Sequence, residues 1–267
     1  MRTYLLILAL AILALPAAAA EPDFASEVVD ATFKLFHTDS TATCFCVRRD
    51  APDSALYVVT AAHAFERTKG DTAIIVLRQK KDDGSCKRVD HTIAIRRDGK
   101  ALWVKHEKYD IAVLRVAEAP PVAVAALPLS VFADALRFKA SGLHICSPLF
   151  VLSYPERFEF NASGFPVARN AIIANPLQFP VQTYPTFLAD FTTFAGDSGG
   201  PVFVAGTEGH ALLVGLVLAR FRHDEKIKTE DDERTIHHPL GLGTILHAQF
   251  ILDTLDAAAK QAAPAAK

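Results

Sequence analysis

Three residue types that together can cleave an acyl bond occur in separate motifs of this sequence. His63 closes the run Thr-Ala-Ala-His, Asp110 opens the run Asp-Ile-Ala-Val-Leu, and Ser198 lies in Gly-Asp-Ser-Gly-Gly-Pro. A serine hydroxyl is a weak nucleophile and needs a base, which an imidazole can supply. A carboxylate can then hold the imidazole tautomer and stabilise the imidazolium that forms. The motifs therefore predict nucleophilic catalysis by Ser198, with His63 as the base and Asp110 as its orienting partner.

Glycines surround the candidate nucleophile at positions 196, 199 and 200. Glycine adopts backbone angles that other residues avoid, so a tight turn can form here and aim N–H groups at one point. Donors fixed where negative charge develops are what an oxyanion hole requires. We expect the backbone N–H groups of Gly196 and Ser198 to form it.

The elements that must position these residues have the pattern of short strands. Apolar or β-branched runs of strand length cover residues 55–60, 73–77, 111–116, 150–152 and 212–218, with turn residues between them. His63 follows the first run and Asp110 begins the third, so both are expected at strand ends. Many short strands with closely spaced turns predict an antiparallel barrel or sandwich.

The first twenty residues have the composition of an export signal. Arg2 precedes a short apolar run, and Pro16 and four alanines precede Glu21. A membrane anchor or a buried helix is the alternative, although the run is too short for a comfortable span. We expect cleavage after Ala20, a mature domain over residues 21–258, no stable membrane association and an oxidising destination.

Other segments carry weaker patterns. Residues 116–129 contain three prolines and form a natural connection between two halves, and apolar residues at helical spacing predict a helix over residues 244–258. The alanine-rich tail, 259–267, is expected to be disordered. The charged segment 222–239 is either a solvated excursion between strands or a flap over a binding cleft.

Composition excludes some classes of partner. The chain has 28 Lys+Arg and 30 Asp+Glu among 267 residues, a formal charge of -2. This balance gives no electrostatic reason to expect nucleic acid or an anionic membrane as the main partner.

Four cysteines suit two disulfides in an oxidising compartment, or they remain free as buried thiols. Cys44 and Cys46 lie two apart on an expected strand and would pair poorly with each other, but the sequence does not choose among the pairings with Cys86 and Cys146. No spacing typical of a zinc site occurs.

The three motifs as a set resemble those of the trypsin-like, chymotrypsin-fold serine peptidases, especially the bacterial branch without an activation propeptide. The resemblance implies an all-β fold of two six-stranded antiparallel β-barrels, about 28–120 and 130–243, followed by the C-terminal α-helix. It also implies a secreted or periplasmic serine endopeptidase that acts on protein or peptide substrates through a Ser-His-Asp triad, with no metal or organic cofactor.

The resemblance also places the specificity residues. Thr192 corresponds to the floor of the family's primary pocket, and its lack of charge does not support a preference for Lys or Arg. Arg220 corresponds to the pocket wall, where it either faces solvent or meets an acidic substrate residue. The sequence lacks the family's activation motif, so Asp197 needs a partner other than a new N-terminal ammonium, or the loop is organised differently.

Two alternatives remain at this point. The sequence around Ser198 also satisfies the G-x-S-x-G pattern of α/β-hydrolase esterases, although that fold needs a helix after the serine and places Asp and His after it. The second alternative is a triad-bearing fold that serves as a binding protein.

Overall fold

The computed structural model describes residues 23–38, 40–49, 55–207, 209–229 and 232–262, with Arg220 described only in its backbone. The expected export signal, 1–20, and the last five residues of the expected disordered tail lie outside these ranges. In the part described, no helix is both long and apolar enough to cross a membrane.

The first half of the chain forms an eight-stranded sheet in which β5, β4, β1, β2, β3, β9 and β8 are hydrogen-bonded in that order. The eighth strand, β10, pairs in parallel with β2. It lies in the segment expected to be an irregular connection, where the buried Leu127 aligns with Val47, so this half has more strands than the six expected. The strands are β1 (Thr32–His37), β2 (Ser40–Arg48), β3 (Leu56–Thr60), β4 (Thr72–Lys80), β5 (Cys86–Ala94), β8 (Trp103–Lys105), β9 (Ala112–Arg115) and β10 (Leu127–Pro128); β6 (Arg96–Arg97) and β7 (Lys100–Ala101) pair separately.

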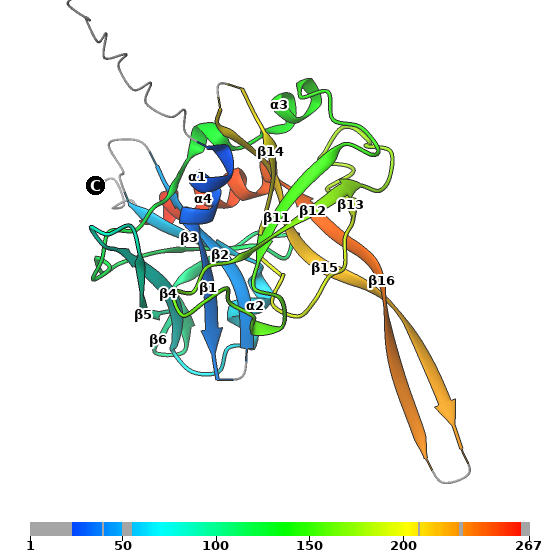
Figure 1. Cartoon of the computed structure of the whole chain (residues 1–267), viewed down its shortest axis with the longest axis horizontal. Coiled ribbons are helices and arrows are strands. Elements are labelled where there is room, and N and C mark those ends of the chain that lie inside the picture. The colour runs from blue at the N-terminus through cyan, green and yellow to red at the C-terminus, as the bar shows by residue number, and fades with distance from the viewer. Residues whose placement is uncertain (1–22, 39, 50–54, 208, 230–231, 263–267) are drawn as a thin grey trace, which may run out of the picture.

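The second half is a closed barrel of six strands, in the order β11, β12, β13, β16, β15 and β14. These strands are β11 (Pro148–Ser153), β12 (Val167–Ile173), β13 (Thr186–Asp190), β14 (Pro201–Ala205), β15 (Ala211–Lys228) and β16 (Glu233–His247). Figure 1 shows the two halves side by side. The predicted all-β class, with a barrel in the second half and a C-terminal helix, is confirmed.

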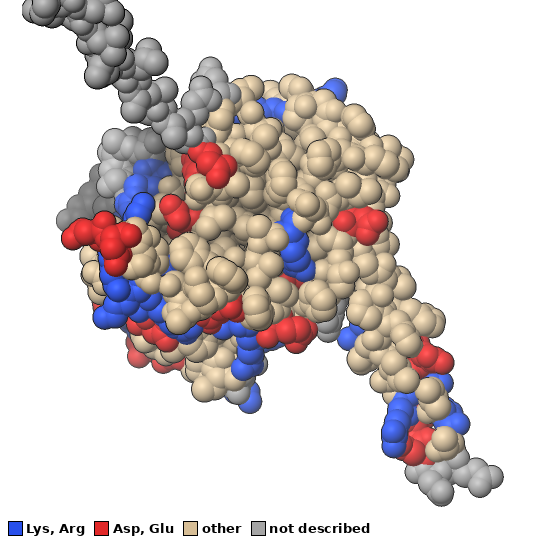
Figure 2. Space-filling view, in the orientation of Figure 1, with Lys and Arg blue, Asp and Glu red and all other residues tan. Residues whose placement is uncertain are grey.

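Strands β15 and β16 continue beyond the barrel as a two-stranded arm, which projects from the body in Figure 1. The arm takes up the charged segment 222–239, so this segment is a hairpin rather than a loop. Cross-strand pairs run from Arg222 opposite Pro239 to Lys228 opposite Glu233. Figure 2 shows charged side chains of both signs along the arm.

The sequence predicted one helix, and the described residues form four: α1 (Phe24–Ala31), α2 (Ala62–Arg67), α3 (Ala135–Ala140) and α4 (Ala248–Ala262), with 3₁₀ turns η1 (Leu129–Val131) and η2 (Pro155–Arg157). The predicted start of α4 at Thr244 is wrong, because residues 244–247 complete β16. The predicted disorder of residues 259–262 is also wrong, because α4 continues past residue 258 to Ala262. Ile245 and Leu246 are both fully buried although they point to opposite faces of the strand. Ile245 packs inside the barrel, whereas Leu246 packs between the two halves.

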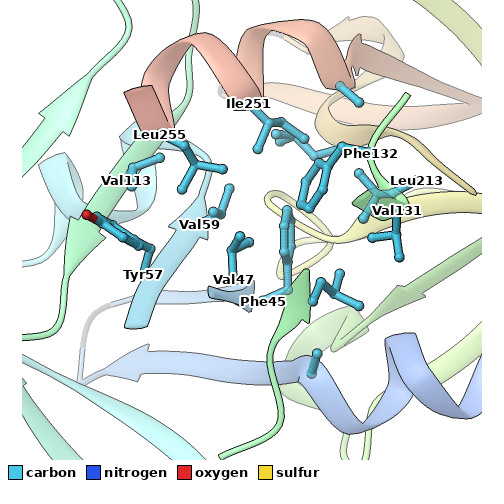
Figure 3. Packing of buried hydrophobic residues seen from close by; sticks show 14 of the residues in the cluster. Phe45, Val47, Tyr57, Val59, Val113, Val131, Phe132, Leu213, Ile251 and Leu255 are labelled. Carbon is cyan, nitrogen blue, oxygen red and sulfur yellow. The ribbon is translucent and has the colours of Figure 1, made fainter. Parts of the chain in front are cut away.

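A shared hydrophobic cluster joins the two halves. In Figure 3, Phe45, Val59 and Val113 from the first half converge with Leu213 from the second. Helix α4 closes this cluster with Ile251 and Leu255. Separate clusters fill the first-half sheet and the barrel interior. A continuous hydrophobic core therefore fixes the position of the two halves relative to each other.

Candidate active site

His63 and Asp110 are joined by two hydrogen bonds. The backbone N–H of His63 donates to Asp110 Oδ1 at 2.8 Å, and His63 Nδ1 lies 2.5 Å from Asp110 Oδ2. His63 is the second residue of α2, which follows the buried strand β3, and Asp110 precedes β9. Strands β3 and β9 pair antiparallel with Thr60 opposite Ala112. This register brings the end of one strand to the start of the other, and so brings the two side chains together.

The carboxylate of Asp110 is stabilised as an anion. Partial burial on its own raises the pKa of Asp110, but the hydrogen bonds and charge of His63, together with Lys105, outweigh burial and lower the pKa. The charged carboxylate accepts a hydrogen bond from the protonated Nδ1 of His63. Nε2 is then the unprotonated nitrogen of the ring, which can act as a base.

Ser198 lies in the tight loop that precedes β14. Gly196 has φ +98° and Gly199 has φ +85°, in the region that favours glycine. A Cβ atom at Gly196 would lie 2.2 Å from the Tyr154 carbonyl oxygen, and one at Gly199 would lie 2.2 Å from the Thr43 carbonyl oxygen. Both glycines are therefore required by backbone angle and by space.

Thr43 on β2 ties this loop to the first half. Its N–H donates to the Ser198 carbonyl at 3.0 Å, and its hydroxyl donates to the Gly196 carbonyl at 2.8 Å. Thr60 holds the Thr43 carbonyl in turn through a 2.8 Å hydrogen bond. Thr43 was not predicted as a site residue, since a single threonine in a strand gives no signal of a contact with a residue more than 150 positions away.

His63, Asp110 and Ser198 line one cleft of about 630 Å³. The Ser198 hydroxyl donates to the Leu218 carbonyl at 3.2 Å. Among the described residues, no hydrogen bond joins Ser198 Oγ to the imidazole. The structure thus holds the three predicted residues at one site, with the hydroxyl directed at the strand β15 backbone.

The two N–H groups predicted to form an oxyanion hole have no hydrogen-bond acceptor among the described residues. Within the described ranges, neither Gly196 N–H nor Ser198 N–H donates a hydrogen bond, whereas the N–H groups of Asp197, Gly199 and Gly200 all do. Two amides of the same loop therefore remain available to a ligand in the cleft.

Asp197 has the internal partner that its position requires. Its side chain is only 2% exposed, and Arg169 Nη2 on β12 lies 2.6 Å from its Oδ1. Ser153 Oγ donates to the same oxygen at 2.8 Å, and the Phe194 N–H donates to Oδ2 at 2.7 Å. Arg169 thus supplies the cationic partner that the sequence predicted Asp197 to need.

Of the two residues predicted to set specificity, Thr192 does not line the cleft, and the side chain of Arg220 is not described. Thr192 is exposed and is not among the residues that line the cleft; its carbonyl accepts a hydrogen bond from Arg169. The neighbouring Thr193 lines the cleft instead. Arg220 lies on β15 opposite Gly243, and its side chain is outside the described part of the structure. The cleft wall formed by β15 includes Ala219 and Arg222.

The predicted disulfides are absent, because all four cysteines are free. Cys44 and Cys46 are buried in the first half, where burial raises the pKa of Cys46 to about 12. Cys86 begins the edge strand β5, and Cys146 is exposed just before β11 in the second half. The thiols therefore lie in three separate parts of the fold, and of the two alternatives, disulfides or free thiols, the structure has free thiols.

Comparison with known proteins agrees with this architecture. A model of the trypsin-like peptidase domain matches residues 42–216. A search of curated proteins by sequence finds no match. An inactive form of a serine-to-alanine mutant of Rv3671c from Mycobacterium tuberculosis is 19% identical, with 94% of this chain and 96% of that chain covered and a TM-score of 0.51.

Two further solved structures have the same fold. The protease Anisep from Arthrobacter nicotinovorans is 16% identical, with coverage of 88% of this chain and 97% of that chain and a TM-score of 0.52. Human heparin binding protein is 12% identical, with coverage of 90% and 96% and a TM-score of 0.54. Such identities show the fold alone.

Two β halves that meet at the cleft define a chymotrypsin-like protein. The family model covers more than half of the sequence, so the chain belongs to the trypsin-like peptidase family. Membership of a peptidase family implies protein or peptide substrates.

Proposed function

We propose that this protein is a serine endopeptidase with Ser198 as its nucleophile. The observation that carries the proposal is the hydrogen-bonded pair of His63 and Asp110 in the same cleft as the Ser198 hydroxyl. The N–H groups of Gly196 and Ser198 in the same loop have no acceptor among the described residues. The α/β-hydrolase alternative is disfavoured, because strand β14 rather than a helix follows the serine.

The first half of the reaction forms an acyl-enzyme. Rotation about the Ser198 Cα–Cβ bond releases Oγ from the Leu218 carbonyl and turns it towards His63 Nε2. His63 removes the hydroxyl proton while Oγ bonds to the peptide carbonyl carbon, and the carbonyl electron pair moves onto oxygen. The N–H groups of Gly196 and Ser198 hold that oxyanion. The C–N bond then breaks, and His63 donates its proton to the leaving amine.

The second half repeats these steps with water. His63 removes a proton from water, the hydroxide oxygen bonds to the acyl carbon, and the bond to Ser198 Oγ breaks as His63 returns the proton to it. Throughout, Asp110 keeps the imidazole in one tautomer and balances its charge when it is protonated. None of these steps needs a metal or an organic cofactor.

Labelling with a fluorophosphonate probe and cleavage of fluorogenic peptides test the proposal. Ser198→Ala is expected to abolish labelling and to lower turnover by on the order of 10⁴-fold or more. Ser130→Ala, an exposed serine outside the cleft, serves as the matched control and is expected to keep both activities. Labelling of Ser198→Ala at the parent rate would show that another residue is the nucleophile. Failure of the parent protein to react with any probe or peptide would favour the binding-protein alternative.

We also propose that the chain is exported and cleaved after Ala20, on the pattern of residues 1–20. N-terminal sequencing of the protein recovered outside the cytoplasm is expected to begin at Glu21. Recovery of only the full-length chain inside the cytoplasm would contradict this proposal.

A further inference from the structure

Three arginines from three different elements line the cleft. Arg67 ends α2, Arg157 ends η2, and Arg222 lies on β15 where the arm leaves the barrel. All three residues are exposed. Both halves of the molecule therefore contribute arginines to the lining of the cleft.

Two of the three guanidinium groups have no partner in the part of the chain that the structure describes. The side chains of Arg67 and Arg157 make no hydrogen bond or ion pair with the described part of the chain. Arg222 Nε lies 3.0 Å from Asp224 Oδ1, which leaves its two terminal nitrogens without a partner among the described residues. Each of the three arginines can thus donate to a ligand.

Two of the carboxylates that line the cleft are already engaged. Asp110 uses both oxygens for His63, and Asp197 is buried against Arg169. Glu156 Oε1 accepts a hydrogen bond from the Ala195 N–H at 3.2 Å. Glu156 is exposed and keeps its negative charge, whereas the charges of Asp110 and Asp197 are engaged by His63 and Arg169. A substrate in the cleft therefore meets three arginines and one carboxylate, Glu156, that has no cationic partner among the described residues.

The rest of the lining strengthens a charge interaction. Apart from the catalytic residues and the charged groups, most of the lining side chains are small or apolar: Ala42, Ala64, Thr193, Phe194, Ala195, Val217, Leu218 and Ala219. Such walls exclude water from a bound peptide, and a charge pair is stronger where water is excluded. A guanidinium also matches the two oxygens of a carboxylate in a bidentate hydrogen bond.

We infer that the cleft selects acidic peptides, in which Asp or Glu residues flank the bond to be cleaved. This inference rests on the proposed function for the cleavage itself, but the binding preference stands on the arginines alone. It assigns specificity to Arg67, Arg157 and Arg222, in place of the sequence-based assignment to Thr192 and Arg220. Peptides with Lys or Arg at the same positions are expected to be rejected by like charge.

Matched peptide pairs test the inference. Each pair differs only by Glu against Gln, or Asp against Asn, at one position on either side of the cleavable bond. With the parent protein, the acidic member is expected to have a kcat/KM about tenfold higher at one or more positions. The preference is expected to shrink as salt is added, because exposed charges are screened.

The same pairs are measured by fluorescence anisotropy on the Ser198→Ala protein, which binds without cleaving. Tighter binding of the acidic member is expected there too, and this readout does not need catalysis. A parent protein that prefers acidic peptides in binding but is never labelled or active would overturn the proposed function and leave this inference standing.

Variants assign the preference to residues. Arg67→Gln, Arg157→Gln and Arg222→Gln are each expected to reduce the acidic preference at the position that the arginine faces, and the corresponding glutamate variants are expected to favour Lys-containing peptides. Arg97→Gln is the matched control, because Arg97 is an exposed arginine on β6 outside the cleft. Equal binding and cleavage of acidic and amide peptides, within about twofold, would overturn the inference.

Discussion

The ion pair of Arg169 and Asp197 is the contact that fixes the loop around the candidate nucleophile. Asp197 adjoins Ser198 in sequence, and its carboxylate is buried. A buried carboxylate is stable only when it is paired and hydrogen-bonded. Arg169 also packs against the ring of Phe191, with its guanidinium carbon 5.1 Å from the ring centroid. The loop is thus held ready by a residue of the folded domain itself.

Removal of one partner of this pair tests its role. Arg169→Met leaves a buried carboxylate without its cation, and we expect a loss of about 3–5 kcal/mol in the free energy of unfolding. Asp197→Asn strands the guanidinium in the same way. The double variant is expected to lose less than the sum of the two single variants, since neither charge is then left alone. Denaturant titration of the four proteins measures this coupling, and strict additivity would contradict it.

The rate of fluorophosphonate labelling provides a second readout for the same variants. Loss of the ion pair is expected to slow labelling even at temperatures where the variant remains folded, because the loop presents both Ser198 and the amides that bind the oxyanion. Parent-like labelling of folded Arg169→Met would show that the pair contributes stability only.

At the scale of elements, strand ends determine where the chemical groups lie. The buried run of β3 ends at Thr60, and the pairing of β3 with β9 sets the distance between His63 and Asp110. Strand pairing also explains why the start of α4 was predicted at the wrong residue. Ile245 and Leu246 fit the apolar spacing of a helix, but pairing with β13 and β15 keeps residues 244–247 in the barrel.

His247, the last residue of β16, makes this junction sensitive to pH. Its ring packs against Phe138 of α3 and Phe187 of β13, with centroids 4.5 and 5.1 Å away. Burial lowers the pKa of His247 from 6.5 to about 4, against a smaller opposing effect of a hydrogen bond with the Tyr184 backbone. The folded state therefore excludes a proton that the unfolded chain accepts.

The expected consequence is a loss of stability as the pH falls from 6.5 towards 4. In this window the unfolded chain binds more protons than the folded protein does. The free energy of unfolding therefore decreases as the pH decreases, by about 3 kcal/mol in total from this residue. Below the folded pKa both states are protonated and this residue adds no further loss. Denaturant titrations at several pH values across the window give the free energy of unfolding as a function of pH. We expect this free energy to depend less steeply on pH in His247→Leu than in the parent protein. Identical slopes would show that His247 does not titrate on unfolding.

For the whole molecule, the shared cluster between the halves is the feature on which the cleft depends. Helix α4 comes last in the sequence, yet Ile251 and Leu255 pack against residues of both halves (Figure 3). His63 and Asp110 belong to one half and Ser198 to the other. Their relative position is therefore set by packing at this interface as well as by hydrogen bonds through Thr43.

Ile251→Ala tests the contribution of the cluster. The side chain is fully buried, so its truncation is expected to leave a cavity and to lower the free energy of unfolding by about 2–5 kcal/mol. Leu136→Ala is the control, because Leu136 is 78% exposed and its loss is expected to cost less than about 0.5 kcal/mol. A single cooperative transition with reduced labelling is expected for Ile251→Ala. Two separate transitions would show that the halves fold independently.

Much of the fold was predictable from local patterns. Apolar runs of strand length, such as residues 73–77 and 212–218, lie within strands of the structure. The helix α1 was missed because its eight residues are close to the shortest run that shows a helical period. The arm was missed because nearly all of its side chains are polar or charged, so segment 222–239 has the composition of a loop and no apolar alternation that would indicate strands.

The sequence by itself determined which chemistry we propose, because the types of the residues at 63, 110 and 198, with the glycines around the serine, restrict what a cleft containing them can do. Only the tertiary structure decided what surrounds that chemistry. It gave Asp197 its counter-ion on β12, left the cysteines unpaired, and lined the cleft with Thr193 and three arginines but not with Thr192. The physical reason is that local propensities act over a few residues, whereas these contacts depend on strand register and on the packing of two halves far apart in the chain.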